Sequence, residues 1–228
     1  MLIGDNLAIR IACVSGHLEM VKFLLSLPKI DPSARDNHAI KGASKAGEVE
    51  VVKLLLKDSR VNPAAQNNSA LIFASEAGHI EVVKLLMEHP RVNPADFDNA
   101  AFLGACRGGH LAVAKLLAKD SRVNPADDHN RALIYACRYG HPNVVDYLLK
   151  EPRIDPSDLD NQAIRDACKY RKTDVVKLLL QDPRIDPTAS DFEALRRALE
   201  EGYSDIVKLL RKHPKMKCKQ VKTILKTQ

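Results

Sequence analysis

Apolar and polar residues recur along the chain with a period of 31 positions, with no insertion or deletion across seven copies. Two alanines four positions apart occur in every copy, first at Ala8 and Ala12, and a leucine follows, first at Leu24. A basic residue closes each copy, from Lys29 to Lys215. Such a period is typical of repeats that bury a shared core by stacking on their neighbours.

Each copy predicts two short helices. In the second copy, Ala39, Ile40, Ala43 and Ser44 would share one face of the first helix, and residues 51–56 carry the apolar face of the second. An Asp-Asn pair precedes the first helix, where its side chains are expected to cap free backbone N–H groups. A glycine is expected to end that helix in the left-handed conformation, and a proline-containing loop ends the second helix.

These patterns predict an all-α solenoid of about seven helix-turn-helix repeats over residues 4–217. Helices of roughly ten residues are not stable alone, so stacking must bury their apolar faces. Residues 211–228 contain seven Lys or Arg residues and no Asp or Glu. We expect this segment to be a basic tail or a helix that caps the seventh repeat, with Val221, Ile224 and Leu225 as its apolar residues.

The segment Ala74–Leu86 resembles the ankyrin repeat pattern A-A-x-x-G-H-x-E-V-V-K-L-L, and similar segments occur in all seven copies. The family's repeat is usually near 33 residues, and its T-P-L-H signature is missing here. We therefore expect the asparagine before the first helix to replace the signature's cap, and the family's β-hairpin to be shortened into a proline-stiffened loop. Arg171 and Lys172 replace Gly-His in the sixth repeat, which puts that turn in question.

Composition and charge limit the classes of function. The net charge is +6, but without the seven basic residues of the C-terminal segment it is −1 (28 basic minus 29 acidic). Four of the five cysteines share one position of the repeat with Ser44, Ser75 and Leu199, which indicates packing rather than metal binding. Free thiols predict a reducing, intracellular location, cytoplasmic or nuclear.

We expect no enzymatic activity, no cofactor and no metal. The histidines of the Gly-His positions are expected to stabilise turns, as the resemblance implies. A catalytic Ser/His/Asp set, a phosphate-binding glycine loop and an H-E-x-x-H motif are absent from the sequence.

The resemblance implies protein binding, as a scaffold or adaptor, through a concave groove lined by the first helices and the loops. The positions of His38, Gly42 and Lys45 lie opposite the paired alanines and change character from repeat to repeat. We predict a basic and aromatic binding patch that favours an acidic partner segment. The residues are Arg107, Arg131, Tyr135, Arg138, Tyr139, Lys169 and Tyr170, with Phe97 and Leu159 as loop extensions.

Three alternatives stay open. The same side chains could be an ordinary solvated helix face. The chain could bind a polyanion, either nucleic acid or acidic lipid, through the basic tail and the groove arginines. The apolar positions Leu7, Ile11 and Val14 leave the first repeat unprotected, so either the sequence begins inside a longer protein or something covers this end. We expect a monomer or a fragment of a larger protein.

Overall fold

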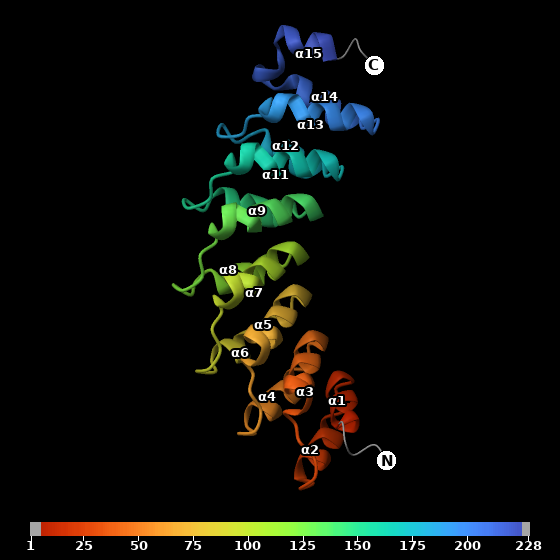
Figure 1. Ribbon diagram of the computed structural model, residues 1–228, viewed down its shortest axis with the longest axis vertical. Helices are drawn as coiled ribbons and strands as arrows, with labels where there is room; N and C mark the ends of the chain where they lie inside the picture. The colour runs from red at the N-terminus through yellow and green to blue at the C-terminus, as the bar shows by residue number, and fades with distance from the viewer. Residues whose placement is uncertain (1–5, 225–228) are drawn as a thin grey trace. The chain divides into compact units, whose positions relative to one another are not determined.

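The computed structural model describes residues 6–224 as an all-helical chain, and these residues contain no β-strand. Contacts between Cα atoms divide the chain into two compact units. Unit 1 comprises residues 1–105 and 112–124, and unit 2 comprises residues 106–111 and 125–228. Each unit is a series of helix pairs, as the ribbon in Figure 1 shows.

The helices follow the predicted alternation of first and second helices within each repeat. Unit 1 holds α1 (Leu7–Val14), α2 (Leu18–Ser26), α3 (Ala34–Ala46), α4 (Val49–Leu56), α5 (Ala65–Ala77) and α6 (Ile80–Met87). The unit boundaries divide α7 (Asp96–Gly108) and α8 (Leu111–Leu117). Unit 2 holds α9 (Asp127–Tyr139), α10 (Pro142–Leu149), α11 (Asp158–Lys169), α12 (Thr173–Leu179), α13 (Ala189–Glu200), α14 (Ser204–Lys212), the short 3-10 helix η1 (Pro214–Met216) and α15 (Lys219–Ile224).

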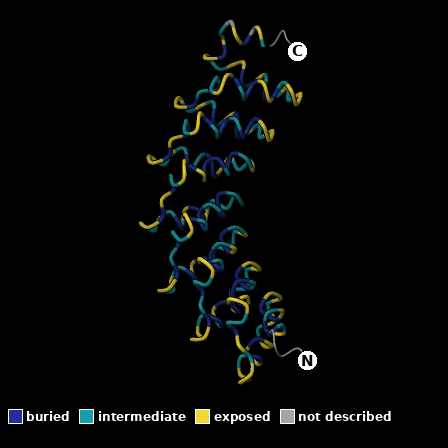
Figure 2. Tube along the Cα trace, viewed as in Figure 1, coloured by how far each residue is buried: buried dark blue, intermediate teal, exposed yellow. Residues whose placement is uncertain are grey.

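Within each unit, first helices pack on first helices and second helices on second helices. In unit 1, α3 contacts α1 and α5, while α4 contacts α2 and α6. Ala39 and Ala43 on α3 are fully buried, because alanine lets neighbouring helices approach closely. Figure 2 shows the buried residues on the facing sides of the helices and the exposed ones mainly at the turns and loop tips.

Each first helix is preceded by a turn of left-handed backbone. In the second repeat, Arg35, Asp36 and Asn37 have φ values of 53°, 54° and 61°. The same three positions are left-handed in five further repeats, from Gln66–Asn68 to Ser190–Phe192. Asp and Asn tolerate this conformation better than other residues with a side chain, which explains the recurring Asp-Asn pair.

The asparagine of this turn does not cap the helix that follows it, so the predicted cap was wrong. Its Oδ1 instead accepts a hydrogen bond from a backbone N–H 25 residues later, in the loop that begins the next repeat. The six bonds join Asn6 to Asp31, Asn37 to Asn62, Asn68 to Asn93, Asn99 to Asn124, Asn130 to Asp155 and Asn161 to Asp186. This asparagine ladder ties each repeat to the next.

The turn between the two helices of the sixth repeat keeps the geometry of the others. Arg171 has a φ of 53°, where the other repeats place a glycine such as Gly78 at 81°. The N–H of Lys172 bonds to the carbonyl of Ala167 at 2.8 Å, as that of His79 bonds to Ala74 at 2.9 Å. Arg171 at the glycine position therefore strains the backbone but does not change the geometry of the turn.

We expect Arg171→Gly to be more stable than Arg171→Ala by about 1 kcal/mol, because only glycine adopts this φ without a steric cost. Both variants lose the contact of the Arg171 guanidinium with the Tyr203 ring, at 5.2 Å, so their comparison isolates the backbone effect. Urea unfolding of the two variants measures the difference. An alanine variant as stable as the glycine variant would contradict a strained turn.

The cysteine position of the repeat lies in the core. Cys106, Cys137 and Cys168 are fully buried, and burial raises the pKa of Cys13 and Cys168 to about 12. These thiols therefore pack as small apolar side chains.

Two repeats place serine in this buried position at a cost in stability. The hydroxyls of Ser44 and Ser75 are buried and have no hydrogen-bond partner within residues 6–224. We expect Ser75→Cys to raise the free energy of unfolding by about 1 kcal/mol, because it removes an unsatisfied hydroxyl from the core. Ser69→Ala is the matched control: the Ser69 hydroxyl donates to the carbonyl of Gln66, so no gain is expected. Equal effects of the two changes in thermal unfolding would contradict this explanation.

The basic residue at the end of each repeat stabilises the loop in which it lies through hydrogen bonds. Arg60 donates to Asp58 two residues earlier and to the Ile30 carbonyl of the preceding repeat, at 2.9 Å. Arg184 makes the equivalent bonds to Asp182 and to the Ile154 carbonyl. Hydrogen bonds from these arginines lower the pKa of Asp58 and Asp182. The arginines at these positions are therefore part of the scaffold.

Two short helices, η1 and α15, follow the seventh repeat. Met216 in η1 and Val221 in α15 are buried, and Ile224 is half-buried. Lys215 forms an ion pair with Asp186 at 3.0 Å. Leu225, also expected in a capping helix, lies outside the described residues.

Candidate partner-binding site

The first-helix face comprises the positions of His38, Gly42 and Lys45 and their equivalents at intervals of 31 residues. In unit 2, α9 places Arg131, Tyr135 and Arg138 at these positions. On α11 they are Gln162, Asp166 and Lys169. The invariant alanines on the opposite side of each helix are buried, so they fix which side chains form this face.

Asp166 and Arg138 form the anchored pair of this face. Asp166 keeps only 5% of its side chain exposed, and its Oδ2 accepts bonds from Nε and Nη2 of Arg138, both at 2.8 Å. Gln162 donates to the other carboxylate oxygen at 2.6 Å. Burial would lower the pKa of Arg138, but hydrogen bonding to Asp166 and the charge of that residue outweigh burial and raise it.

Two tyrosine rings lie close to the Arg138 guanidinium, and a third packs against one of them. Its Cζ lies 5.7 Å from the ring centroids of both Tyr135 and Tyr170. Tyr139 packs edge-on against Tyr135, with 6.4 Å between centroids, and Lys169 lies over the Tyr170 ring at 5.3 Å. We call these five residues the Tyr–Arg cluster. Tyr139 and Tyr170 remain 49% and 42% exposed, so the cluster presents ordered aromatic rings to solvent.

The cluster brings together five of the nine residues predicted from the sequence. Arg131 is exposed and paired with Asp128. Arg107 is half-buried near the end of α7, where its carbonyl bonds to His141 Nε2 at 2.7 Å. Phe97 belongs to unit 1 and is 65% exposed in the left-handed turn of its repeat; Leu159 occupies the equivalent turn in unit 2.

The predicted charge of the patch is partly neutralised. Arg131 and Arg138 each face a carboxylate, and the sequence pattern did not reveal either pairing. The cluster is therefore more aromatic and less basic than the sequence suggested.

Unit 1 also carries a hollow on its first-helix face, which the predicted patch did not include. It has a volume of about 640 Å³, within the range of small-ligand sites, and lies over Gly42 between Val14 and Phe73. The signal in the sequence was a glycine at a position where the flanking repeats carry Ile11 and Phe73. A Cβ on Gly42 would lie 2.5 Å from Val14 Cγ2, so the helices approach closely here.

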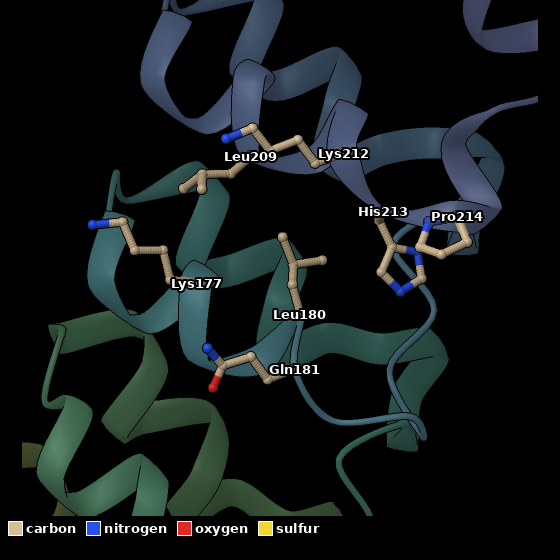
Figure 3. A pocket seen from close by; sticks show the side chains of 7 residues that line it. All are labelled: Lys177, Leu180, Gln181, Leu209, Lys212, His213 and Pro214. Carbon is tan, nitrogen blue, oxygen red and sulfur yellow. The ribbon is translucent and has the colours of Figure 1, made fainter.

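The second helices form a different kind of hollow. Figure 3 shows one of 340 Å³ in unit 2, where Leu180 and Leu209 line the space between α12 and α14. Another of 320 Å³ in unit 1 is lined by the equivalent residues, including Leu56 and Leu85. A hollow that recurs at the repeat period follows from the packing of second helices and carries no specific recognition.

The recurring histidines serve the scaffold. Nε2 of His79 bonds to the Lys45 carbonyl of the preceding repeat at 3.1 Å, and its ring packs against Gly47. His141 makes the same bond to Arg107. Within residues 6–224, no group of three His, Cys, Asp or Glu residues is placed to hold a metal ion. No helix in the same range is long and apolar enough to cross a bilayer.

Comparison with known families agrees with this geometry. Residues 9–99 and 92–160 match the family described as ankyrin repeats (3 copies). The chain belongs to the ankyrin repeat family. A search of curated proteins gave no match. Among solved structures, the crystal structure of the human ASB11 ankyrin repeat domain is similar, with a TM-score of 0.63 and 18% identity over 82% of this chain and 95% of that one.

The ankyrin repeat assignment confirms the predicted family and the predicted all-α repeat fold. Ankyrin repeats are generally protein–protein interaction modules, and their fold is a known binding scaffold rather than an enzyme fold.

Proposed function

We propose that this ankyrin repeat protein holds a partner protein against its first-helix face, with the Tyr–Arg cluster as the main contact in unit 2. The observation that carries the proposal is the exposure of Tyr139 and Tyr170 in a cluster whose arginine, Arg138, is paired with the buried Asp166. Tyrosine and arginine dominate binding energies in protein interfaces. Side chains that are already ordered lose little conformational entropy on binding.

The charges in the cluster indicate which chemical groups the partner segment should present. Arg138 is matched by Asp166, whereas Lys169 has no carboxylate partner among residues 6–224. The partner segment should therefore place apolar or aromatic groups on the tyrosines and an acidic group near Lys169.

Polyanion binding has less support than protein binding. Lys22, Lys53, Lys84 and Lys177 on the second helices pair with an acidic residue three positions earlier. Groove residues Arg131 and Arg138 are also paired, and Lys215 of the basic tail faces Asp186. Retention on heparin that depends on residues 212–228 would favour this alternative. For the location, buried free cysteines support a reducing compartment.

The test compares partner capture by two surface variants. Arg138→Ala is unsuitable, because it would leave Asp166 buried and unpaired. Tyr139→Ala with Tyr170→Ala removes the exposed rings and leaves that pair intact. Proteins captured from an extract of the source cells are identified by mass spectrometry, and the affinity of each purified candidate is then measured.

We expect the tyrosine variant to bind its partner at least about thirtyfold more weakly, since two central hot-spot residues together contribute 2 kcal/mol or more. Lys177→Ala with Gln181→Ala, on the second helices, is the matched control and should bind normally. Normal binding by the tyrosine variant, or equal weakening by both variants, would refute this site.

A further inference from the structure

Lys41 on α3 is a buried cation without a counter-charge. It is only 8% exposed, and its Nζ donates to the amide oxygen of Gln66 at 2.5 Å. No carboxylate forms an ion pair with it among residues 6–224. The other charged side chain buried in the described residues, Asp166, is matched by Arg138. A buried charge facing only a neutral amide is costly, and an anion that reached it would remove that cost.

Lys41 lines the hollow over Gly42, so an incoming group can reach it. The other walls are the side chains of Val14, His38, Lys45 and Phe73. Val14 and Phe73 are partly exposed although apolar, and Lys45 Nζ lies 5.8 Å from the Phe73 ring centroid. The hollow thus combines an apolar wall with the ammonium groups of Lys41 and Lys45.

The surroundings of the hollow are positive as well. Burial and the charges of Arg10, Lys41 and Arg35 lower the pKa of His38, which shows that these cations act at the same place. Asp36 accepts a bond at 2.9 Å from the amide nitrogen of Gln66, the residue whose amide oxygen accepts from Lys41. The glutamine therefore separates Asp36 from Lys41.

We propose that this hollow is a socket for an acidic side chain that adjoins an apolar one in an extended partner segment. The carboxylate would lie against Lys41 and Lys45, and the apolar group would lie between Val14 and Phe73. The inference deepens the proposed function, because it names the chemistry that the first-helix face of unit 1 accepts. The charge complementarity of the socket selects an anion, and its apolar wall selects the neighbouring residue.

The affinities of three short peptides, measured by isothermal titration calorimetry or by NMR, test the socket directly. The first is acetyl-Ser-Gly-Glu-Phe-Gly-Ser-amide, and the second replaces its glutamate with glutamine. The third, acetyl-Ser-Gly-Gly-Phe, has a free terminal carboxylate instead of an acidic side chain. We expect the protein to bind the glutamate peptide about tenfold more tightly than the glutamine peptide, a ratio typical of a charge-assisted contact. NMR shifts should centre on Gly42, Lys45 and Phe73.

Lys41→Met removes the charge and keeps an unbranched side chain, so we expect it to fold. In this variant the preference for glutamate should fall below about threefold, while Lys53→Met on the second helix of the same repeat should keep it. Lys45→Met should reduce the preference for the glutamate peptide in part. This variant provides the test if Lys41→Met does not fold.

Equal affinity of the native protein for the glutamate and glutamine peptides would overturn the socket, as would a preference that survives Lys41→Met. Tighter binding of the peptide with the free terminal carboxylate would overturn the assignment to an acidic side chain. If the proposed function is wrong, a different result is expected: the tyrosine variant of unit 2 would capture its partner normally.

Discussion

Asn68→Ala should lower the free energy of unfolding by about 3 kcal/mol, one of the largest effects of a single change in this chain. Asn68 is 3% exposed; its Oδ1 accepts from the N–H of Asn93 at 3.2 Å, and its Nδ2 donates to Asp96 at 2.7 Å. Alanine would remove both bonds and would also be strained at a φ of 59°. Urea unfolding monitored by circular dichroism measures the loss.

Two companion variants separate the hydrogen bonds from the backbone strain. Asn68→Gly removes the bonds but suits the left-handed backbone, so we expect a loss of about 2 kcal/mol. Asn67→Ala changes the neighbouring residue, which has a φ of 55° and whose side chain forms no hydrogen bond shown within residues 6–224, and should cost about 1 kcal/mol. If Asn68→Ala cost no more than Asn67→Ala, the asparagine ladder would not be what joins the repeats.

Arg138→Met should destabilise the protein by about 3 kcal/mol, because it leaves the Asp166 carboxylate buried without its partner. Arg131→Met is the control: its pair with Asp128 is exposed, so a loss below about 1 kcal/mol is expected. Thermal and urea unfolding measure both variants.

The double variant Arg138→Met with Asp166→Leu should recover most of the lost stability, since an apolar pair of similar volume needs no counter-charge. Additive losses in this double-mutant cycle would mean that the two side chains do not depend on each other. The same cycle separates the structural role of Arg138 from the binding role proposed for Tyr139 and Tyr170.

The repeat architecture was predictable because local patterns determine it. The alanine and leucine columns define the buried faces, and the glycine position defines the turn even where Arg171 occupies it. The role of the asparagine was not predictable, because its hydrogen-bond partner lies 25 residues away and Asn is equally typical of a helix cap.

The candidate site was predictable only in part. The period placed Tyr135, Arg138 and Lys169 on one face, but it could not show that Asp166 neutralises Arg138 from the next repeat. The number of charged residues also could not single out Lys41. Only the packing of α3 shows that this side chain is buried against an amide rather than a carboxylate. Side-chain pairing between repeats depends on three-dimensional geometry that a one-dimensional period does not contain.

Hydrogen exchange of the protein with and without its captured partner tests the central claim most directly. Binding to the first-helix face predicts slower amide exchange in α9 and α11, around residues 135–139 and 166–170, and in the socket segment of α3. The second helices α10 and α12 should exchange as in the free protein. Protection confined to the second helices or to residues 214–224 would contradict the account.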